Sequence, residues 1–220
     1  MKENIGNKRH LLNGIDLGSS GNSILTFLDM VKQKSFIDIA NFPLKQYRKI
    51  NSYHPICADL INLPYRSESF DFVSALDVLE HIKDDKLAIS EISRILKKKG
   101  IALITVPHRM RYYSTQDKII GHFRRYEINT IISDFKKFSL KNLKTFCIYG
   151  RLMAIADIQS TNPKKIEQNL IKLRNNYESN LVFQKFWNVI VKIFSKFMKI
   201  DAKFCPKFKI RNIGLLFVKD

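Results

Sequence analysis

A short glycine-containing stretch near the start of the chain constrains the fold more than any other feature. Gly14-Ile15-Asp16-Leu17-Gly18-Ser19-Ser20-Gly21-Asn22 connects an apolar run to residues 23–31, whose apolar positions have helical spacing. We therefore expect a strand, a tight turn and the N-terminus of a helix. Glycine lets a ligand approach the main chain, and a helix N-terminus offers unpaired N–H groups. The stretch predicts a turn that binds a cofactor, with a purely structural turn as the alternative.

The residues of this turn discriminate between cofactors. Nicotinamide and flavin dinucleotides favour G-x-G-x-x-G, because their pyrophosphate sits on the turn. Here only Gly18 and Gly21 are present, and Asp16 directly precedes them. A carboxylate at that point suits a cation better than a phosphate. S-adenosylmethionine carries both an ammonium and a sulfonium, so it is the cofactor that the turn favours.

Strand and helix patterns then alternate along the first half of the chain. Short apolar strands are predicted at 35–39, 53–58, 70–76 and 101–106. Between the last two, a helix is expected to open at Asp84-Asp85 and to end at Lys97-Lys98-Lys99 before Gly100, with charges that suit its dipole. This alternation predicts an α/β fold, a doubly wound parallel sheet with helices on both faces.

The composition limits the class of protein. A chain of 220 residues fits one domain, expected to span 1–220. Its three cysteines are odd in number and far apart, which favours a reducing, cytoplasmic setting, and no apolar run reaches membrane-spanning length. The formal net charge of +18 is compatible with nucleic acid, an anionic membrane or an acidic substrate, or with a lysine-rich proteome alone.

Several acidic and apolar stretches occur in a characteristic order. They are Asp16-Leu17-Gly18-Ser19-Ser20-Gly21, then Asp38, then Asp59-Leu60 with Leu63-Pro64, then Phe70-Asp71-Phe72-Val73 through Leu79-Glu80-His81-Ile82, and finally a Lys-x-Gly turn at Gly100. Over residues 11–107 this combination resembles the class I S-adenosylmethionine-dependent methyltransferases, in their small-molecule branch. The resemblance implies a Rossmann-like, seven-stranded, mostly parallel sheet in the order 3-2-1-4-5-7-6.

The resemblance also implies roles for individual residues in cofactor binding. Asp16 and the backbone at Gly18 would hold the methionine end. Asp38 would accept hydrogen bonds from the ribose hydroxyls, a role that also fits its position 20 residues after Gly18. Asp59 would bind the adenine amino group, and Leu60 would pack on the ring.

Three further positions complete the expected cofactor site. The main chain near Leu76 would line the sulfonium side, and Gly21 belongs to the turn itself. Ser20 stands where the family usually has a further glycine. Serine fits there if its φ stays negative.

The last third of the chain departs from the family pattern. Residues 143–149 and 213–218 read as the two final strands, so 151–206 is a helical insertion, or lid, before the last strand. One helix is expected from Pro163 to about Tyr177, and a second over Leu181–Lys199, which is amphipathic and basic. Such a helix lies on a membrane surface, covers a lipid-like substrate, or packs over the cleft or on a second subunit.

The reaction requires alignment above all, because the sulfonium is already activated. An oxygen or nitrogen acceptor can also need a base. The candidates for the catalytic group are His81, His122 and Tyr126, with His108 as a further histidine. Asp77-x-x-Glu80-His81 is similar to the acid-x-x-Glu-His triad of ubiquinone-pathway O-methyltransferases, which implies a divalent metal as an alternative; our prediction is that no metal is used.

These observations define three functional hypotheses. The first is methyl transfer to an O or N of a small or lipid- or glycan-linked acceptor, with arginines at 109, 111, 124 and 125 near the substrate. The second is an RNA methyltransferase, although the segment after residue 74 lacks the Asn/Asp-Pro-Pro-aromatic tetrapeptide of base-amine methylases. The third is an inactive fold that binds a partner. The expected location is cytoplasmic, with peripheral membrane contact through 181–199.

Overall fold

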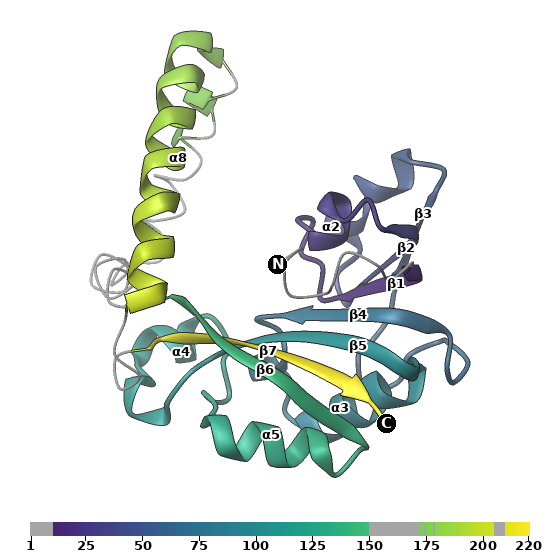
Figure 1. Ribbon diagram of the computed structural model, residues 1–220. Helices are drawn as coiled ribbons and strands as arrows, with labels where there is room; N and C mark the ends of the chain where they lie inside the picture. The colour runs from purple at the N-terminus through teal and green to yellow at the C-terminus, as the bar shows by residue number, and fades with distance from the viewer. Residues whose placement is uncertain (1–10, 150–171, 174, 178, 205–209) are drawn as a thin grey trace.

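A single seven-stranded sheet organises the chain in the computed structural model, which describes residues 11–149, 172–173, 175–177, 179–204 and 210–220 (Figure 1). The strand order is β3-β2-β1-β4-β5-β7-β6, in which β7 is antiparallel to both of its neighbours and β1 to β5 are parallel. The predicted fold class and strand order are therefore confirmed.

The strands are β1 Leu11–Leu17, β2 Val31–Asp38, β3 Tyr53–Cys57, β4 Phe70–Leu76, β5 Leu96–Pro107, β6 Leu140–Tyr149 and β7 Asn212–Lys219. The α-helices are α2 Asn41–Leu44, α3 Asp85–Ile95, α4 Thr115–Ile119, α5 Ile128–Lys136 and α8 Leu181–Phe204. Four short 3₁₀ turns are η1 Ile24–Phe27, η2 Tyr47–Lys49, η3 Leu79–His81 and η4 Met110–Tyr112.

The hydrophobic core lies on both faces of the central strands. β4 and β5 are almost continuously buried, as parallel strands covered on both sides must be. Helices α3 and α5 pack on one face (Figure 1). There the rings of Phe135 and Phe217 stack with centroids 4.2 Å apart, and neither side chain is exposed. A second cluster around Phe36 and Phe72 fills the opposite face.

The helix expected over residues 23–31 is wrong. The chain makes one 3₁₀ turn, η1, and Val31 already begins β2. Only 13 residues separate Leu17 from Val31, too few for a turn, a full helix and a second turn. Ser23 holds the tight turn locally: its Oγ accepts a hydrogen bond from the Leu25 N–H, and its carbonyl accepts one from Thr26 Oγ1. In the described part of the chain, no α-helix therefore begins at the glycine turn.

The helix that opens at Asp84-Asp85 ends earlier than its sequence pattern indicates. Asp84 caps α3 by accepting the Leu87 N–H, but the helix ends at Ile95, and Lys97 to Lys99 belong to β5. Leu96 already pairs with Phe70 of β4, so the strand ladder replaces the last helical turn. The three lysines are therefore not at the helix end, and Lys97 instead forms an ion pair with Asp71 at 2.9 Å.

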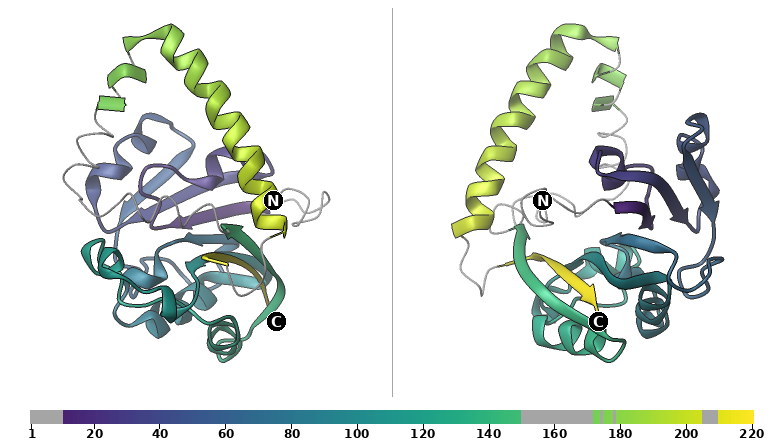
Figure 2. Two further views of the ribbon diagram at one scale, coloured as in Figure 1. Left: turned by 90° about the vertical axis from the view of Figure 1, so that its left-hand side faces the viewer. Right: turned by 45° about the vertical axis from the view of Figure 1, so that its right-hand side comes forward.

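The long helix α8 lies between β6 and β7 in the chain and stands away from the sheet (Figures 1 and 2). It extends five residues beyond the predicted end at Lys199, to Phe204, and none of its residues is buried. Most of the helix expected from Pro163 to about Tyr177 lies outside the described residues. The described residues between 172 and 177 are helical. No described helix combines the length and apolar character required to cross a bilayer.

Candidate functional site

A crevice of about 980 Å³ opens at the carboxyl ends of β1, β2 and β4, where open α/β sheets bind ligands. Its lining includes six of the residues singled out from the sequence: Gly18, Ser20, Asp38, Asp59, Leu60 and His81. These residues come from four separate segments of the chain. The fold therefore brings most of the expected cofactor residues to one place.

The glycine turn forms one wall of the crevice and is strongly bent. Gly18, Ser20 and Gly21 all have positive φ, of +69°, +44° and +81°. The condition of a negative φ at Ser20 is therefore not met, because the turn keeps the left-handed conformation that glycine adopts easily. At Gly18 a Cβ atom would lie 2.4 Å from Val78 Cγ2, so glycine is required there on steric grounds as well.

Asp38 is held rigidly at the end of β2. One carboxylate oxygen accepts the Ser20 N–H at 2.9 Å, and the other accepts the Ala40 N–H at 2.8 Å. The side chain is 7% exposed and lies on the crevice wall. Each carboxylate oxygen has a second lone pair, so this fixed group suits the two hydroxyls of a ribose.

Asp16 lies beneath the crevice and does not line it. Its carboxylate is 3% exposed and accepts a hydrogen bond from the Ser74 hydroxyl of β4. Burial raises the pKa of Asp16 to about 6, against the lowering effect of the hydroxyls of Ser74 and Ser23. A cation bound above it would stabilise the ionised form, so its proposed role toward an ammonium is electrostatic.

The remaining cofactor residues divide into two groups. Asp59 and Leu60 line the crevice, and Asp59 fixes its own loop by accepting the Ile61 N–H at 3.1 Å. Leu76 and Gly21 are absent from the described lining: Leu76 packs into the core, and a Cβ at Gly21 would lie 2.5 Å from the Gln46 side chain. The lining beside Leu76 is formed by the next two residues, Asp77 and Val78.

Glu80, His81 and His122 form a cluster beside the crevice. Each offers a ligand atom, and these atoms lie within 4.8 Å of one another. The two imidazole rings meet edge to face, with centroids 4.5 Å apart. Burial and the neighbouring His122 lower the pKa of His81, so its imidazole is neutral at neutral pH. His81 is exposed on the crevice wall and is therefore able to accept a proton.

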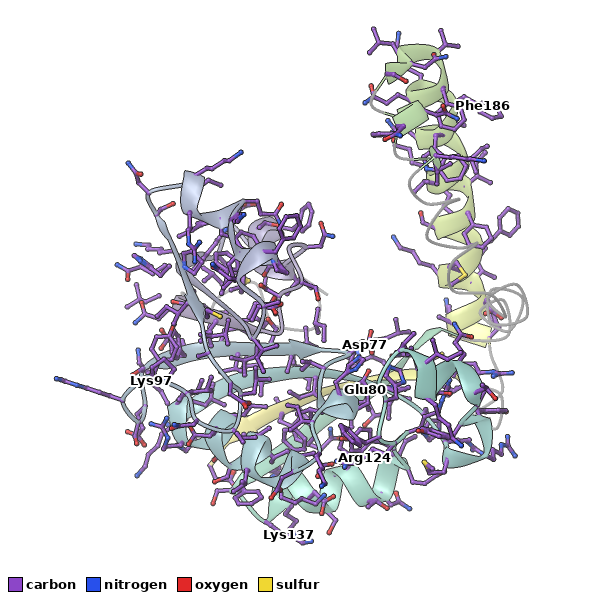
Figure 3. The ribbon with its side chains drawn as sticks, turned by 180° about the vertical axis from the view of Figure 1, so that it is seen from behind. Asp77, Glu80, Lys97, Arg124, Lys137 and Phe186 are labelled. Atoms are coloured by element: carbon purple, nitrogen blue, oxygen red, sulfur yellow. The ribbon has the colours of Figure 1, made fainter. Side chains whose placement is uncertain are left out.

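His122 and Glu80 belong to a second, smaller cavity of about 240 Å³ that shares Asp77 and His81 with the crevice. Asp117 accepts a hydrogen bond from His122 Nδ1 at 2.8 Å, which leaves Nε2 facing Glu80 Oε1 at 3.9 Å. Glu80 is 1% exposed, and burial, with the nearby charge of Asp77, raises its pKa to about 8. Figure 3 shows Asp77 and Glu80 close together at this point.

Tyr126 and His108 line neither cavity. The Tyr126 hydroxyl donates to Asp85 at 2.8 Å in the core, and burial, together with the charge of Asp85, raises its pKa. The His108 ring contacts the Tyr126 carbonyl through Nδ1 and Arg109 Nε through Nε2. The structure thus places Tyr126 as a support for the segment that carries His122, not in contact with the crevice.

Two of the arginines near the substrate side are occupied by internal contacts. Arg124 forms an ion pair with Asp85 at 2.9 Å and donates to the Lys83 carbonyl at 2.7 Å. Arg125 binds both oxygens of Asp117, each at 2.9 Å. These contacts, bidentate for Arg125, position the loop, so neither guanidinium is offered whole to an acceptor.

The triad that suggested a divalent metal is not assembled as its spacing implies. The Asp77 carboxylate accepts a hydrogen bond from Asn212 Nδ2 at 2.7 Å, and His122 takes its place beside Glu80 and His81. One carboxylate and two imidazoles are a donor set compatible with several divalent metals. The prediction that no metal is used stays untested.

Comparisons with known proteins identify a matching family and similar sequences. Residues 15–104 match the family described as "Methyltransferase domain". An uncharacterized protein of Methanocaldococcus jannaschii is 26% identical over 169 residues, 77% of this chain and 65% of that protein. An Arabidopsis thaliana tRNA (carboxymethyluridine(34)-5-O)-methyltransferase is 43% identical over 54 residues, 23% of this chain and 13% of that enzyme. The chain thus spans less than two thirds of either relative.

A solved structure extends the match to the whole sheet. The Haemonchus contortus phosphoethanolamine N-methyltransferase 2, in complex with S-adenosyl-L-methionine, superposes with a TM-score of 0.61 at 17% identity. The superposition covers 99% of this chain and 50% of that enzyme. The family match over residues 15–104 and the strand order of the sheet together identify a methyltransferase domain with the fold of the class I S-adenosylmethionine-dependent enzymes.

The sequence reasoning missed several residues of the site. Phe123 and Lys83 line the crevice beside His81, and Glu80 was considered only as a metal ligand. The Phe123 N–H donates to the Glu80 carbonyl at 2.8 Å, which joins two segments 43 residues apart. The only available signal was the aromatic and basic content of residues 121–126, which does not reveal such a pairing.

Proposed function

We propose that this domain transfers the methyl group of S-adenosylmethionine to an oxygen or nitrogen of a small or lipid- or glycan-linked acceptor. The observation that supports this proposal is the 240 Å³ cavity, which meets the crevice at Asp77 and His81. A cavity of this size admits a small polar group, or the polar end of a larger molecule, toward the reacting carbon.

The chain's own residues would hold the two reactants in line. Asp38 and Asp59 would bind the nucleoside, and Asp16 would attract the ammonium from beneath the turn. When bound, the cofactor would supply an activated methyl group, which the acceptor lone pair would take while the electron pair of the carbon–sulfur bond stays on sulfur. His81 would take the acceptor proton on its neutral imidazole.

His122 has a supporting role in this proposal. Its Nδ1 is engaged by Asp117, and Arg125 binds that same carboxylate. This chain of contacts fixes the ring against His81, so we expect His122 to position the base and not to replace it. Arrangements of this kind orient catalytic imidazoles in many sites.

The test uses methyl-labelled S-adenosylmethionine and a cell extract separated into small-molecule, lipid and RNA fractions. We expect label in the small-molecule or lipid fraction. Replacing His81 by Gln should reduce the rate by about 10²-fold or more, the usual contribution of a general base, with cofactor affinity unchanged in calorimetry. An unchanged rate in His81→Gln would reject the proposed base. Activity that is lost with a chelator and restored by a divalent metal would reject the metal-free form.

The second candidate function is methylation of RNA. The net charge of +18 favours it, as does the name of the Arabidopsis relative. Binding to phosphates would make the activity strongly salt-dependent. Label recovered in a nuclease-sensitive fraction, falling steeply as salt rises, would establish this function and exclude the first one.

A further inference from the structure

Helix α8 exposes more apolar surface than a packed helix of a globular protein. None of its 24 residues is buried. Eleven large apolar side chains of this helix are exposed, among them Phe186 at 61%, Phe197 at 58% and Phe204 at 72%. Large exposed apolar surfaces mark sites of interaction. This helix therefore has a surface that requires a partner.

The lysines of α8 are separated from most of its apolar residues around the helix axis, while Asp201 falls on the apolar side. At 3.6 residues per turn, the apolar side chains cover about 200° of the circumference, twice the stripe of an ordinary surface helix. The five lysines fall within about one sixth of the circumference on the other side. They are Lys185, Lys192, Lys196, Lys199 and Lys203, all exposed. The helix carries only one acidic residue, Asp201, so its charge is strongly positive.

The apolar surface continues from the helix onto the sheet edge. Trp187, Ile190 and Phe194 line a hollow of about 1330 Å³, and Phe146 and Ile148 of β6 form its other side. The other edge of the apolar face, with Phe186, points to solvent. Figure 3 shows Phe186 near the far end of α8, well away from Asp77 and Glu80. The surface is thus separate from the crevice.

We infer that α8 docks the protein on an anionic membrane surface. The lysine stripe matches the negative charge of a bilayer that contains acidic lipids, and lysine stems reach from an interfacial helix to the headgroups. The aromatic and branched side chains enter the boundary between headgroups and acyl chains. A helix with one lysine stripe and an apolar face this wide fits a lipid interface, because the apolar face enters the bilayer boundary while the lysines stay among the charged headgroups.

Docking requires no methyl transfer, so it can be tested independently of the proposed function. If both hold, the acceptor reaches the crevice from a lipid surface, which favours a lipid-linked acceptor over a freely diffusing one. Vesicle binding without S-adenosylmethionine tests the docking alone.

The experiment is co-sedimentation of the full chain with vesicles of phosphatidylcholine, with or without one third phosphatidylglycerol. We expect binding to the mixed vesicles at least about tenfold tighter than to the neutral ones, weakening several-fold as salt rises. Phe186→Asp with Phe197→Asp should abolish it, while cofactor binding and the circular dichroism spectrum stay unchanged. Lys192→Gln with Lys196→Gln should remove mainly the salt-dependent part.

A matched control keeps the experiment decisive. Ile119 is also exposed, at 52%, but lies outside α8 and lines neither the crevice nor the smaller cavity, so Ile119→Asp should bind vesicles as the native chain does. Equal sedimentation of the native chain and the double Phe variant would overturn the inference. So would a dimeric mass in lipid-free solution that the same variant converts to a monomer, because a second copy would then cover the face.

Discussion

Two regions of this molecule, the crevice and helix α8, differ in which side chains they bury and which they expose. Around the crevice, carboxylates such as Asp16 and Asp38 are buried and bonded to neighbouring groups. Along α8, phenylalanines are exposed and no residue is buried. Burying charge is costly unless partners compensate, and exposing apolar surface is costly unless a partner covers it. The carboxylates around the crevice therefore find their partners within the chain, whereas the apolar side chains of α8 lack a partner that covers them.

The largest expected effect compares one phenylalanine from each region. Phe217→Ala should lower the free energy of unfolding by about 3–5 kcal/mol, because the ring is fully buried against Phe135. Phe186→Ala should change it by less than about 0.5 kcal/mol. Urea denaturation in lipid-free buffer measures both. A similar loss in the two variants would show that α8 is packed in solution and would remove the contrast.

Asp38 gives the largest effect expected on ligand binding. Asp38→Ala removes the acceptor of the Ser20 and Ala40 N–H groups and the proposed ribose contact. We expect the Kd for S-adenosylmethionine to rise at least about 30-fold, since hydrogen bonds to charged groups contribute about 1.5–3 kcal/mol each. Calorimetric titration measures this, with Asp220→Asn at the exposed chain end as the control. Unchanged affinity would place the nucleoside elsewhere.

Asp16 is expected to affect stability and binding in opposite directions. Its folded pKa, about 6, is above the ordinary 3.8. Below pH 3.8 this carboxyl is protonated in both the folded and the unfolded state and does not affect stability. As the pH rises from 3.8 through 6, its ionisation reduces the stability of the folded state. Asp16→Asn should stabilise the unliganded protein at pH 7.5 by on the order of 2–3 kcal/mol, and by almost nothing at pH 3.5. Thermal unfolding at both values, with reversibility confirmed, checks the sign.

The same carboxylate predicts a pH dependence of cofactor binding. An ammonium above Asp16 favours the ionised form, so affinity should increase as the pH rises through about 6. In Asp16→Asn, affinity should be about tenfold weaker at pH 7.5 and nearly independent of pH between 5 and 7.5. A native chain that shows no such dependence would mean that the methionine end is bound by other groups.

Ser20 gives the smallest expected effect. Its φ of +44° is unfavourable for serine and easy for glycine. Ser20→Gly should therefore stabilise the fold by about 0.5–1 kcal/mol, although the greater freedom of the unfolded chain offsets part of the gain. Denaturant midpoints measure it, with Ser67→Gly, which has no positive φ, as the matched control. A destabilised Ser20→Gly would show that the serine side chain has a structural role.

The strands were predictable because each carries its own local pattern. β4 was placed at both ends from its apolar run, and the strand order followed from the resemblance. The helix after the glycine turn was not predictable from periodicity, because residues 23–31 have helical spacing but belong to too short a connection. The end of α3 was predicted wrongly for a similar reason. Leu96 pairs with β4, although the lysines that follow it are typical of a helix end.

The candidate site was predictable only where one segment defines a role. Asp38, Asp59 and the glycine turn follow short strands whose carboxyl ends must meet at one edge of the sheet. Tyr126 was a plausible catalytic group in sequence, but its hydroxyl lies against Asp85, because its backbone pairs with the chain at the end of β5 and its ring is buried. Sequence spacing cannot show which way such a side chain points.

By itself the sequence determined the parallel sheet, the bent turn and the acids at the strand ends, since these depend on local periodicity and on the chemistry of single residues. Only the tertiary structure decided that Glu80 and His81 meet His122, about 40 residues later in the chain, and that Asp16 lies beneath the crevice. It also decided that no residue of α8 is buried. Such facts depend on which distant surfaces pack together, and burial, which sets pKa values and docking surfaces, exists only after that packing.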